Sequence, residues 1–408
     1  MTAEVAIMNT RGIAMAADSA VTLGGSGKIY NSADKLFALS KEHPVGIMIY
    51  GSAGIMGVSW EIIIKDYRDY LGSKSFDKLI KYKMDFINFL SRYPCFTKKK
   101  SIDYLESRCF DIFSSVLTRF LVALRVEFKD KGKIKLSEIN SLFNTLLKSR
   151  KEYLRKFETQ KQVKPFLGFI NSNQRTINKL IKIVFENYKI SKKQTAELTN
   201  ILKLDFQKCV FIEDYTGIVI AGYGEKEIFP TLCSFQVSGK LGNSLICFEN
   251  EIAQLDTNFS ATIRPFAQTN IVQQFVRGFD WDFLDTANEK VAAILDSMSP
   301  LINDPDKKKT NAISELLEDY QRKLSDTVFK DPILDIVEHM QKSELVSMAE
   351  AMVNLTALKR HISVDGESVG GPIDVALITK GEGFIWIKKK TNYDPNLNRE
   401  LNQNYFRS

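Results

Sequence analysis

The sequence MTAEVAIMNTRGIAMAADSAVTLG, residues 1–24, decides the fold class of this chain. Residues 3–8 and 13–17 are apolar, strand-like runs, and the residues between them have the composition of a turn. In an antiparallel pair that closes around residues 10 and 11, partner numbers sum to about 20 or 21. The predicted hairpin therefore places Thr2 opposite Asp18.

Thr2 is a candidate nucleophile. Because threonine is small, we expect Met1 to be removed, which makes Thr2 the first residue. The free α-amine of Thr2, with an unperturbed pKa of ~8, then serves as the base for its own hydroxyl. A carboxylate beside this pair, as predicted for Asp18, is typical of such a site. The alternatives are a frayed terminus and an aspartate that only caps the end of a strand.

The composition indicates a globular chain with a large core. The chain has 408 residues, 44% of them hydrophobic, which allows two or three average domains or one large domain with insertions. No apolar run is long enough to span a bilayer, so we expect no membrane partner. The five cysteines are scattered and the three histidines lack ligand spacing, so we expect a cytoplasmic protein without metal or cofactor.

Positive charge is concentrated in one internal segment. Residues 95–207 contain 24 Lys and Arg against 11 Asp and Glu, a net charge of +13, whereas the whole chain carries +7. A solvated helical face explains this segment better than nucleic-acid binding does. Docking of a protein partner, or formation of a ring of subunits, is a more attractive role for it than either.

The periodicity of the apolar residues divides the chain into strand and helix blocks. We expect strands over 3–8, 13–17, 35–39, 45–50, 210–215, 217–221, 232–237, 245–249, 373–379 and 383–388. We expect helices over 56–70, 75–92, 102–128, 136–157, 174–188, 266–277, much of 279–340, and 343–361, the last capped by Ser343. The predicted segments are 1–94, 208–278 and 342–390 for the core, 95–207 and 279–341 for inserted helical subdomains, and 391–408 for a polar tail.

The order of these blocks is strands, two helices, strands, two helices and strands, which predicts an α+β fold. Hairpin connections make the sheets antiparallel, and the helix pairs must cover their outer faces. Two stacked sheets between two helical layers satisfy both conditions. We therefore expect a four-layer αββα sandwich of two antiparallel sheets with inserted helical subdomains.

The sequence resembles the N-terminal-nucleophile (Ntn) hydrolases, specifically proteasome β-subunits and the bacterial HslV peptidase. TAEVAIMNTRGIAMAADSAVTLGG, NSADKLFALS and VGIMIYGSAG have the family's order of threonine, aspartate, lysine and glycine. The resemblance returns in GIVIAGYGEKEIF and in SVGGPIDVALITKG, and it does not extend to residues 95–207 or 279–340. It implies the Ntn hydrolase fold.

The resemblance implies catalytic roles for four residues of the first segment. Thr2 matches the family's nucleophile. Asp18 matches the aspartate at the end of the second strand, and Lys35 matches the essential lysine that begins the next strand. Gly51 matches the glycine whose N–H helps to form the oxyanion hole. The alternatives are an exposed edge lysine for Lys35 and a purely conformational glycine for Gly51.

Further positions are implied on the substrate side and near the end of the chain. Thr22 and Ala53 match positions near the family's specificity pocket. Asp365 and Ser368 correspond to an aspartate and a serine that support the amine, although Val369 separates Ser368 from the glycine pair that follows. The family's later serine, in a G-S-G turn, has no counterpart here.

The resemblance also implies an activity. We expect a threonine hydrolase that cleaves amide bonds in peptides or unfolded protein and that forms a homo-oligomer. Since the sequence has no ATP-binding motif, any unfoldase that supplies substrate is a separate ATPase. Two alternatives stay open: a small-molecule amidohydrolase of the same fold, and a catalytically silent assembly or interaction subunit.

Overall fold

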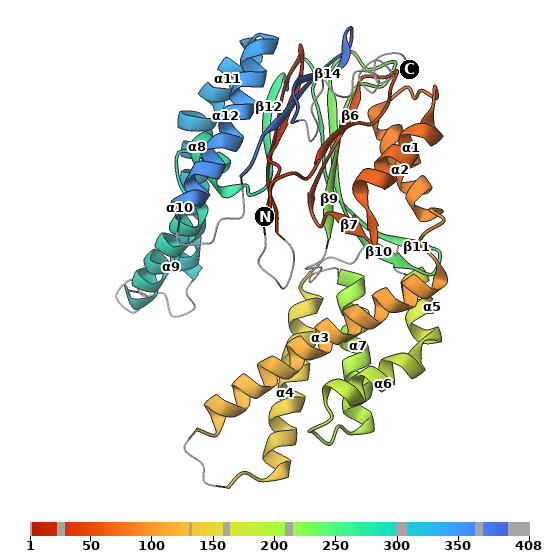
Figure 1. Ribbon diagram of the computed structural model, residues 1–408. Coiled ribbons are helices and arrows are strands. Elements are labelled where there is room, and N and C mark those ends of the chain that lie inside the picture. The colour runs from red at the N-terminus through yellow and green to blue at the C-terminus, as the bar shows by residue number, and fades with distance from the viewer. Residues whose placement is uncertain are drawn as a thin grey trace.

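A computed structural model of the chain describes residues 2–22, 29–129, 133–157, 164–208, 215–298, 308–363 and 370–390. The described residues form an α+β protein with two five-stranded antiparallel sheets (Figure 1). The mixed α+β class and the antiparallel sheets predicted from the sequence are confirmed. Of the predicted strand 210–215, only residue 215 is described. The predicted polar tail 391–408 lies outside the described residues.

The first sheet contains the N-terminal hairpin. Its strands are, in spatial order, β12 (Ala261–Ala267), β1 (Ala3–Asn9), β2 (Gly12–Ala17), β13 (Asp374–Thr379) and β14 (Gly383–Lys388). The beginning and the end of the chain therefore pair in one sheet, because β13 lies directly beside β2. This pairing brings residues near position 370 to the N-terminal strand.

The second sheet is formed by the strands in the middle of the chain. Its order is β11 (Ser244–Gln254), β10 (Thr231–Leu241), β9 (Thr216–Gly222), β6 (Val45–Gly51) and β5 (Leu36–Ala38). Two short hairpins lie outside the sheets: β3 (Val21–Thr22) with β4 (Ile29–Tyr30), and β7 (Gly54–Ile55) with β8 (Val58–Ser59). Strand β6 thus ends beside a hairpin turn.

Both faces of the N-terminal strand are buried. Ala6 and Met8 face the second sheet and belong to the core between the two sheets. The alternate residues Ala3, Val5 and Ile7 face the helices on the other side. A strand covered on both faces has a nearly continuous apolar run, which explains the sequence of β1.

Helices cover the outer face of each sheet. Helix α12 (Lys342–His361), with α8 (Asn270–Arg277) and α11 (Asp331–His339), packs on the first sheet. Helices α1 (Trp60–Leu71) and α2 (Leu79–Ser91) pack on the second sheet (Figure 1).

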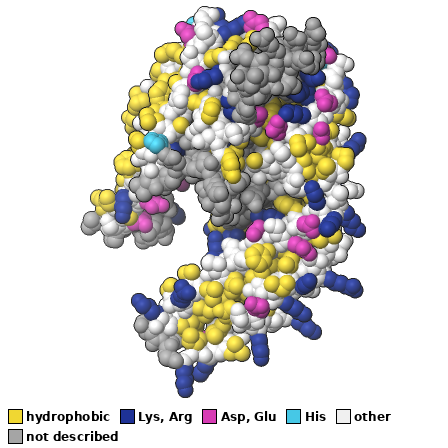
Figure 2. All heavy atoms as spheres, viewed as in Figure 1, with side chains coloured by type: hydrophobic (Ala, Val, Ile, Leu, Met, Phe, Trp, Pro, Cys, Tyr) yellow, Lys and Arg dark blue, Asp and Glu magenta, His cyan; other side chains and the backbone are white. Residues whose placement is uncertain are grey.

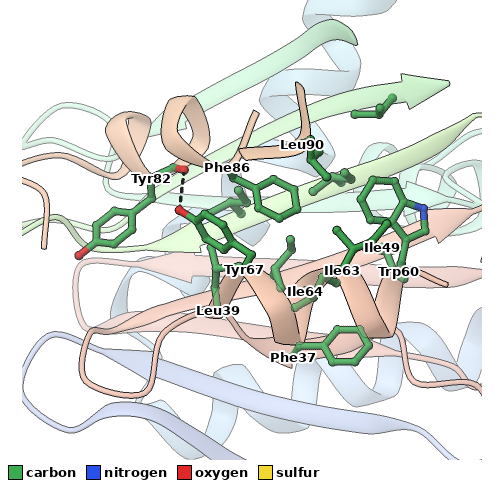
Figure 3. Packing of buried hydrophobic residues seen from close by; sticks show 14 of the residues in the cluster. Phe37, Leu39, Ile49, Trp60, Ile63, Ile64, Tyr67, Tyr82, Phe86 and Leu90 are labelled. Carbon is green, nitrogen blue, oxygen red and sulfur yellow. Dashed lines mark hydrogen bonds between the residues drawn. The ribbon is translucent and has the colours of Figure 1, made fainter. Parts of the chain in front are cut away.

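Aromatic side chains form much of the layer between α1, α2 and the second sheet. The Tyr67 and Phe86 rings lie 4.8 Å apart edge to face, and the Tyr67 hydroxyl donates to the Tyr82 carbonyl oxygen at 3.5 Å (Figure 3). Trp60 is fully buried, and its indole N–H donates to Thr216 Oγ1 at 2.7 Å. This hydrogen bond fixes the start of α1 against the start of β9.

Two groups of helices extend from this core. The first consists of α3 (Lys98–Glu127), α4 (Leu136–Arg155), α5 (Lys164–Ser172), α6 (Gln174–Val184) and α7 (Lys192–Lys208), and its apolar interior also includes Leu241, Ile246 and Phe248 of β10 and β11. The second consists of α9 (Trp281–Met298), α10 (Lys308–Ser325) and the π-helical turn Asp326–Lys330, and most of its side chains are exposed. Within the described residues, no helix combines the length and the apolar composition that crossing a membrane requires.

The hairpin register differs from the prediction by one residue. Glu4 pairs with Ala17, so partner numbers sum to 21 and Ala3, not Thr2, lies opposite Asp18. The reason is the turn: only Thr10 and Arg11 lie between the last pair of the ladder, and a two-residue turn fixes the register.

Three other expectations about the elements are wrong. Residues 261–267 form β12, so the expected helix 266–277 starts later, at Asn270. Pro265 is compatible with this strand because β12 lies at the edge of its sheet. Residues 54–59 form a hairpin, and the helix expected from residue 56 begins at Trp60. The cap of α12 is Gln341, whose backbone N–H is bound by the Glu344 carboxylate, and not Ser343.

Candidate active site

Thr2 lies directly before β1 at the mouth of a pocket of about 190 Å³. The residue is 5% exposed, and its side chain points toward the second sheet, where it contacts Lys35. The pocket is lined on the opposite side by the end of β6, including Gly51 and Ala53. Thr2 thus lines a polar pocket.

Lys35 connects the two sheets at this point. It lies directly before β5 and is 4% exposed. Its ammonium group donates to Thr2 Oγ1 at 3.0 Å, to Asp18 Oδ1 at 2.6 Å and to the Ala20 carbonyl oxygen at 2.6 Å. All three protons of the ammonium are therefore used, which holds the lysine in one orientation.

Asp18 is a buried carboxylate with an unusually complete set of donors. Oδ1 accepts from Lys35 and from the Ala3 amide at 3.0 Å. Oδ2 accepts from the Ala20 amide at 3.3 Å and from the Gly370 amide at 3.0 Å. These four donors, one of them the adjacent ammonium, hold the carboxylate in one orientation. Asp18 therefore anchors Lys35 rather than contacting Thr2 itself.

The Lys35–Asp18 pair is expensive to bury unless it is well hydrogen-bonded, and here it is. Its position beside Thr2 puts a fixed positive charge next to the hydroxyl oxygen, at 3.0 Å from it. A nearby cation stabilises negative charge that develops on an oxygen and disfavours protonation of a neighbouring amine. Both effects suit a threonine nucleophile.

Gly51 ends β6 in a conformation that favours glycine. Its φ is +84°, and a Cβ at this position would lie 2.5 Å from the Tyr215 carbonyl oxygen. The Ser52 amide donates to that carbonyl, so the next pair of the ladder, Gly51 with Thr216, is of the non-hydrogen-bonded kind. The Gly51 N–H consequently points away from β9, to the side of β6 where Lys35 and the pocket lie.

Of the predicted specificity-pocket and amine-supporting residues, only Ala53 is fully described by the structure. Ala53 is exposed and lines the pocket. Thr22 lies in β3, next to the pocket residue Val21, but its side chain is outside the described set. Asp365 and Ser368 both lie outside the described residues.

The glycine pair that precedes β13, Gly370 and Gly371, lies beside Asp18. The Gly370 amide donates to Asp18, and the Gly370 carbonyl accepts from the Ser19 amide at 3.3 Å. Ser19 Oγ also donates to the Pro372 carbonyl oxygen at 2.6 Å. Gly371 has a φ of +77° and packs on Asn31. The turn that precedes β13 therefore helps to hold Asp18 in place.

Sequence reasoning missed Glu4. It lies two residues after Thr2 on the same face of the chain and is buried between the two sheets. The available signal was a charged residue within an otherwise apolar run. In a strand, Glu4 lies on the same face as Thr2, whereas Ala3 and Val5 lie on the opposite face. The prediction treated residues 3–8 as uniformly apolar and gave Glu4 no role.

Among the described residues, no group of three His, Cys, Asp or Glu side chains is arranged to hold a metal ion. The polar groups that converge on the pocket are a hydroxyl, an ammonium, a carboxylate and backbone amides. These groups make the pocket a candidate site for chemistry at the Thr2 hydroxyl.

Comparison with solved structures gives matches of low similarity. Anbu (ancestral beta-subunit) from Yersinia bercovieri is 8% identical with a TM-score of 0.29, over 99% of this chain and 97% of that chain. Anbu from Hyphomicrobium sp. strain MC1 is 10% identical with a TM-score of 0.29, over 100% and 97%. A structure titled "Helical Assembly of the Anbu Complex from Pseudomonas aeruginosa" is 7% identical with a TM-score of 0.29, over 99% and 94%. No protein-family model and no curated protein matches the chain.

These comparisons correct the family expected from the sequence. The matched structures are Anbu proteins, which are proteasome-like but distinct, and the assignment to proteasome β-subunits or HslV does not stand. A likeness at a TM-score of 0.29 carries no argument about activity.

Proposed function

We propose that the protein is a threonine hydrolase that cleaves amide bonds through Thr2 once the residue before it has been removed. The observation that carries the proposal is the contact of the buried Lys35 ammonium with Thr2 Oγ1 at 3.0 Å and with Asp18 Oδ1 at 2.6 Å. A lysine used only for packing or solubility has no need of a threonine hydroxyl and a buried carboxylate as partners.

In the proposed reaction, Thr2 Oγ1 attacks the carbonyl carbon of the substrate amide. The free α-amine of Thr2, directly or through one water molecule, accepts the hydroxyl proton. The C–N bond then breaks, the leaving amine takes that proton, and an ester joins the acyl group to Thr2. Water hydrolyses the ester, so the carboxylic acid leaves and the threonine hydroxyl is restored.

Gly51 and the charged pair stabilise the charge that develops in this reaction. The Gly51 N–H, on the pocket side of β6, is suited to the negative oxygen of the tetrahedral intermediate. The Lys35 ammonium favours the unprotonated amine and the charged hydroxyl oxygen. Asp18 holds Lys35 in this orientation and takes no proton. Asp365 and Ser368 remain proposed supports of the amine.

The fold and the substrate class belong to the same proposal. We infer that the two sheets with their covering helices are the four-layer αββα sandwich of Ntn hydrolases, with residues 95–207 and 279–341 as insertions. Peptides and unfolded protein are the proposed substrates. An amide in an extended chain can reach a pocket that is open to solvent at Ala53 and Ser52.

We also propose that copies of the chain associate through their two helical insertions. Residues 279–341 carry 14 Asp and Glu against 7 Lys and Arg, a net charge of −7, whereas residues 95–207 carry +13. Figure 2 shows Lys and Arg side chains distributed over the lower, helical part of the molecule. The α9–α10 segment exposes large apolar side chains, including Phe283 (72%) and Leu316 (69%). Opposite charge and an uncovered apolar surface favour contact with a second copy.

The test of the proposed function uses two variants of the nucleophile. Thr2→Ala removes the hydroxyl, and Thr2→Ser keeps a hydroxyl of the same reach. Hydrolysis of fluorogenic peptides and of simple acylated amines is measured for both variants and for the wild type. We expect Thr2→Ala to abolish hydrolysis and Thr2→Ser to retain part of it. Equal rates for Thr2→Ala and wild type would contradict the proposal, and activity on acylated amines alone would favour a small-molecule amidohydrolase.

A further inference from the structure

Glu4 is a buried carboxyl group with no hydrogen-bond partner in the part of the chain that the structure describes. The residue is 1% exposed, and neither of its side-chain oxygens has a hydrogen-bond partner among the described residues. Its neighbours across the sheet are Ala17 on β2 and Phe266 on β12, which offer no donor from their side chains. An ionised carboxylate in such a place costs far more than a neutral acid.

Glu4 lies directly behind the nucleophile. Thr2 and Glu4 are two residues apart on the same side of an extended chain, which separates them by ~7 Å. Both side chains face the second sheet, since Thr2 contacts Lys35 there and the alternate residue Ala6 belongs to the core between the sheets. Glu4 is not part of the pocket lining, so it acts on the site from within the core.

Three titratable groups act on Glu4 or respond to it. Burial raises the pKa of the Glu4 carboxyl well above its usual range; the Lys35 ammonium lowers it in part, and the Asp18 carboxylate adds to the rise. Burial, with Tyr215 and Glu4 as smaller causes, raises the pKa of Tyr50 to about 12, so this neighbour stays neutral.

Two other charged groups on this face have ion-pair partners among the described residues. Arg264, on β12, binds Glu251 at 2.9 Å, and Asp374, on β13, binds Lys390. The Arg264 Nε–H has no hydrogen-bond partner among the described residues, but the charge of Arg264 is paired with Glu251, and Lys35 is the cation that lowers the pKa of Glu4. Lys35 is thus the cation over which Glu4 and Asp18 would compete.

The hydrogen bonds show how this competition is resolved. Asp18 receives donors on both oxygens, and Lys35 gives all three protons to Asp18, Thr2 and a backbone carbonyl. Nothing is left for a second carboxylate. Asp18 is thus the carboxylate that pairs with Lys35, whereas Glu4 has no donor among the described residues and stays neutral.

We propose that neutral Glu4 is a positioning residue for the nucleophile: while it keeps its proton, Lys35 stays on Thr2 and Asp18, and loss of that proton draws the ammonium toward Glu4 and away from the Thr2 hydroxyl. This inference rests on the proposed function of Thr2. It makes Glu4 the group that sets the alkaline limit of the reaction. Since no bond other than the O–H of Glu4 changes, the step is a simple deprotonation by solvent.

The first test does not depend on catalysis. Urea unfolding of wild type and Glu4→Gln is followed from pH 4 to pH 8, with Glu152→Gln, an exposed residue of α4, as the matched control. The unfolded Glu4 ionises near pH ~4.3 while the folded residue keeps its proton, so the wild type loses stability as the pH rises above that value. We expect the urea midpoint of Glu4→Gln to exceed that of the wild type at pH 7 and the difference to shrink toward pH 4. A constant difference, or none, would overturn the neutral state of Glu4.

The second test measures how the rate of hydrolysis falls at high pH, the alkaline limb of the pH–rate profile. Hydrolysis, relative to each protein's own rate at pH 7, is followed from pH 7 to pH 10 for wild type and Glu4→Gln. Above the pKa of Glu4 we expect the wild-type rate to fall about tenfold for each pH unit, and the limb of Glu4→Gln to lie at higher pH. Coincident limbs would overturn the positioning role even if the urea data show a neutral Glu4. Absence of hydrolysis in both proteins would instead contradict the proposed function, and the urea result would still decide the protonation state.

Discussion

The Lys35 ammonium lies 3.0 Å from the Thr2 hydroxyl oxygen and belongs to a different sheet from the strand that Thr2 begins. The contact exists because β1 and β5 each start at the same end of the two stacked sheets. Asp18, at the end of β2, holds the lysine from the first sheet at 2.6 Å. The site is therefore assembled by the packing of the sheets, and its activity should depend on this one ion pair.

Replacement of Lys35 by methionine tests that dependence. The variant keeps the length of the side chain but removes the charge beside Thr2, so we expect the rate of amide hydrolysis to fall by ~10²–10³-fold. We expect the unfolding free energy to fall by about 3 kcal/mol, because Asp18 is left buried without a countercharge. Steady-state kinetics and urea unfolding measure the two effects. Lys65→Met is the control, since Lys65 pairs with Glu61 at an exposed position. Loss of stability without loss of rate would show that the pair is only structural.

Gly51→Ala separates a conformational glycine from one that also acts in the reaction. The added Cβ would meet the Tyr215 carbonyl oxygen at 2.5 Å, and the φ of +84° is strained for alanine. We expect a loss of about 1–3 kcal/mol in unfolding free energy and of ~10²-fold in kcat, because the N–H is displaced. Gly168→Ala, in α5 with no atom within 4 Å of the added Cβ, should be neutral or stabilising. A destabilised protein with unchanged kcat would remove Gly51 from the reaction.

A pH dependence of stability is expected from the helical insertion. Burial raises the pKa of Asp205 to about 6, although Arg108 and Arg150 lower it in part. Because the folded pKa lies above that of an unfolded aspartate, ~3.9, the stabilising contribution is complete below pH 4 and is lost as the pH rises through about 6. Asp205→Asn should therefore reduce the difference in unfolding free energy between pH 4 and pH 7 by about 3 kcal/mol.

Asp111→Asn is the matched control for that measurement. Asp111 lies 4.0 Å from the same Arg108 but is 50% exposed, so water screens its charge far more than that of the buried Asp205. Urea unfolding at each pH gives the slopes. Equal slopes for Asp205→Asn and wild type would refute the raised pKa of Asp205.

Self-association through the helical insertions is tested by sedimentation velocity over a range of concentrations. The double variant of Phe283→Ser and Leu316→Ser removes exposed apolar surface from α9 and α10. We expect it to weaken association at least ~10-fold, and we expect added salt to weaken the wild-type assembly because the two insertions have opposite charge. Ile228→Ser, at a residue that is 73% exposed between β9 and β10, is the control. Equal dissociation constants for all three proteins would rule out this surface.

The sequence predicted the strands and turns around the site better than the contacts between residues that lie far apart in the chain. The turn at Thr10-Arg11 and the apolar runs on either side predicted the first hairpin, and β6 followed from an equally simple pattern. The one-residue error at Asp18 arose because the turn could close in two ways on pattern alone. The contact of Lys35 with Thr2 joins two sheets, and no periodicity within either strand contains that information.

Other features depend on long-range pairing. The Gly370 amide reaches Asp18 because β13 pairs with β2, across more than three hundred residues of sequence. The strand through Pro265 was missed because a proline inside a strand is compatible only with a sheet edge, and edges are not visible in the sequence. Glu4 is the clearest case. One charged residue in an apolar run indicates a position that faces solvent. Its burial is known only when both faces of the strand are seen to be covered, by helices on one side and by the second sheet on the other.

The most direct measurement of the central claim is the intact mass of the purified protein before and after reaction with a β-lactone that acylates threonine nucleophiles, followed by peptide mapping. We predict that the residue before Thr2 is absent from the reacting protein, that one acyl group is added per chain, and that it maps to Thr2. Lys35→Met should take up the label far more slowly, and Thr2→Ala should take up none at this position. A protein that retains Met1, or an adduct that maps elsewhere while Thr2 stays unmodified, would contradict the account.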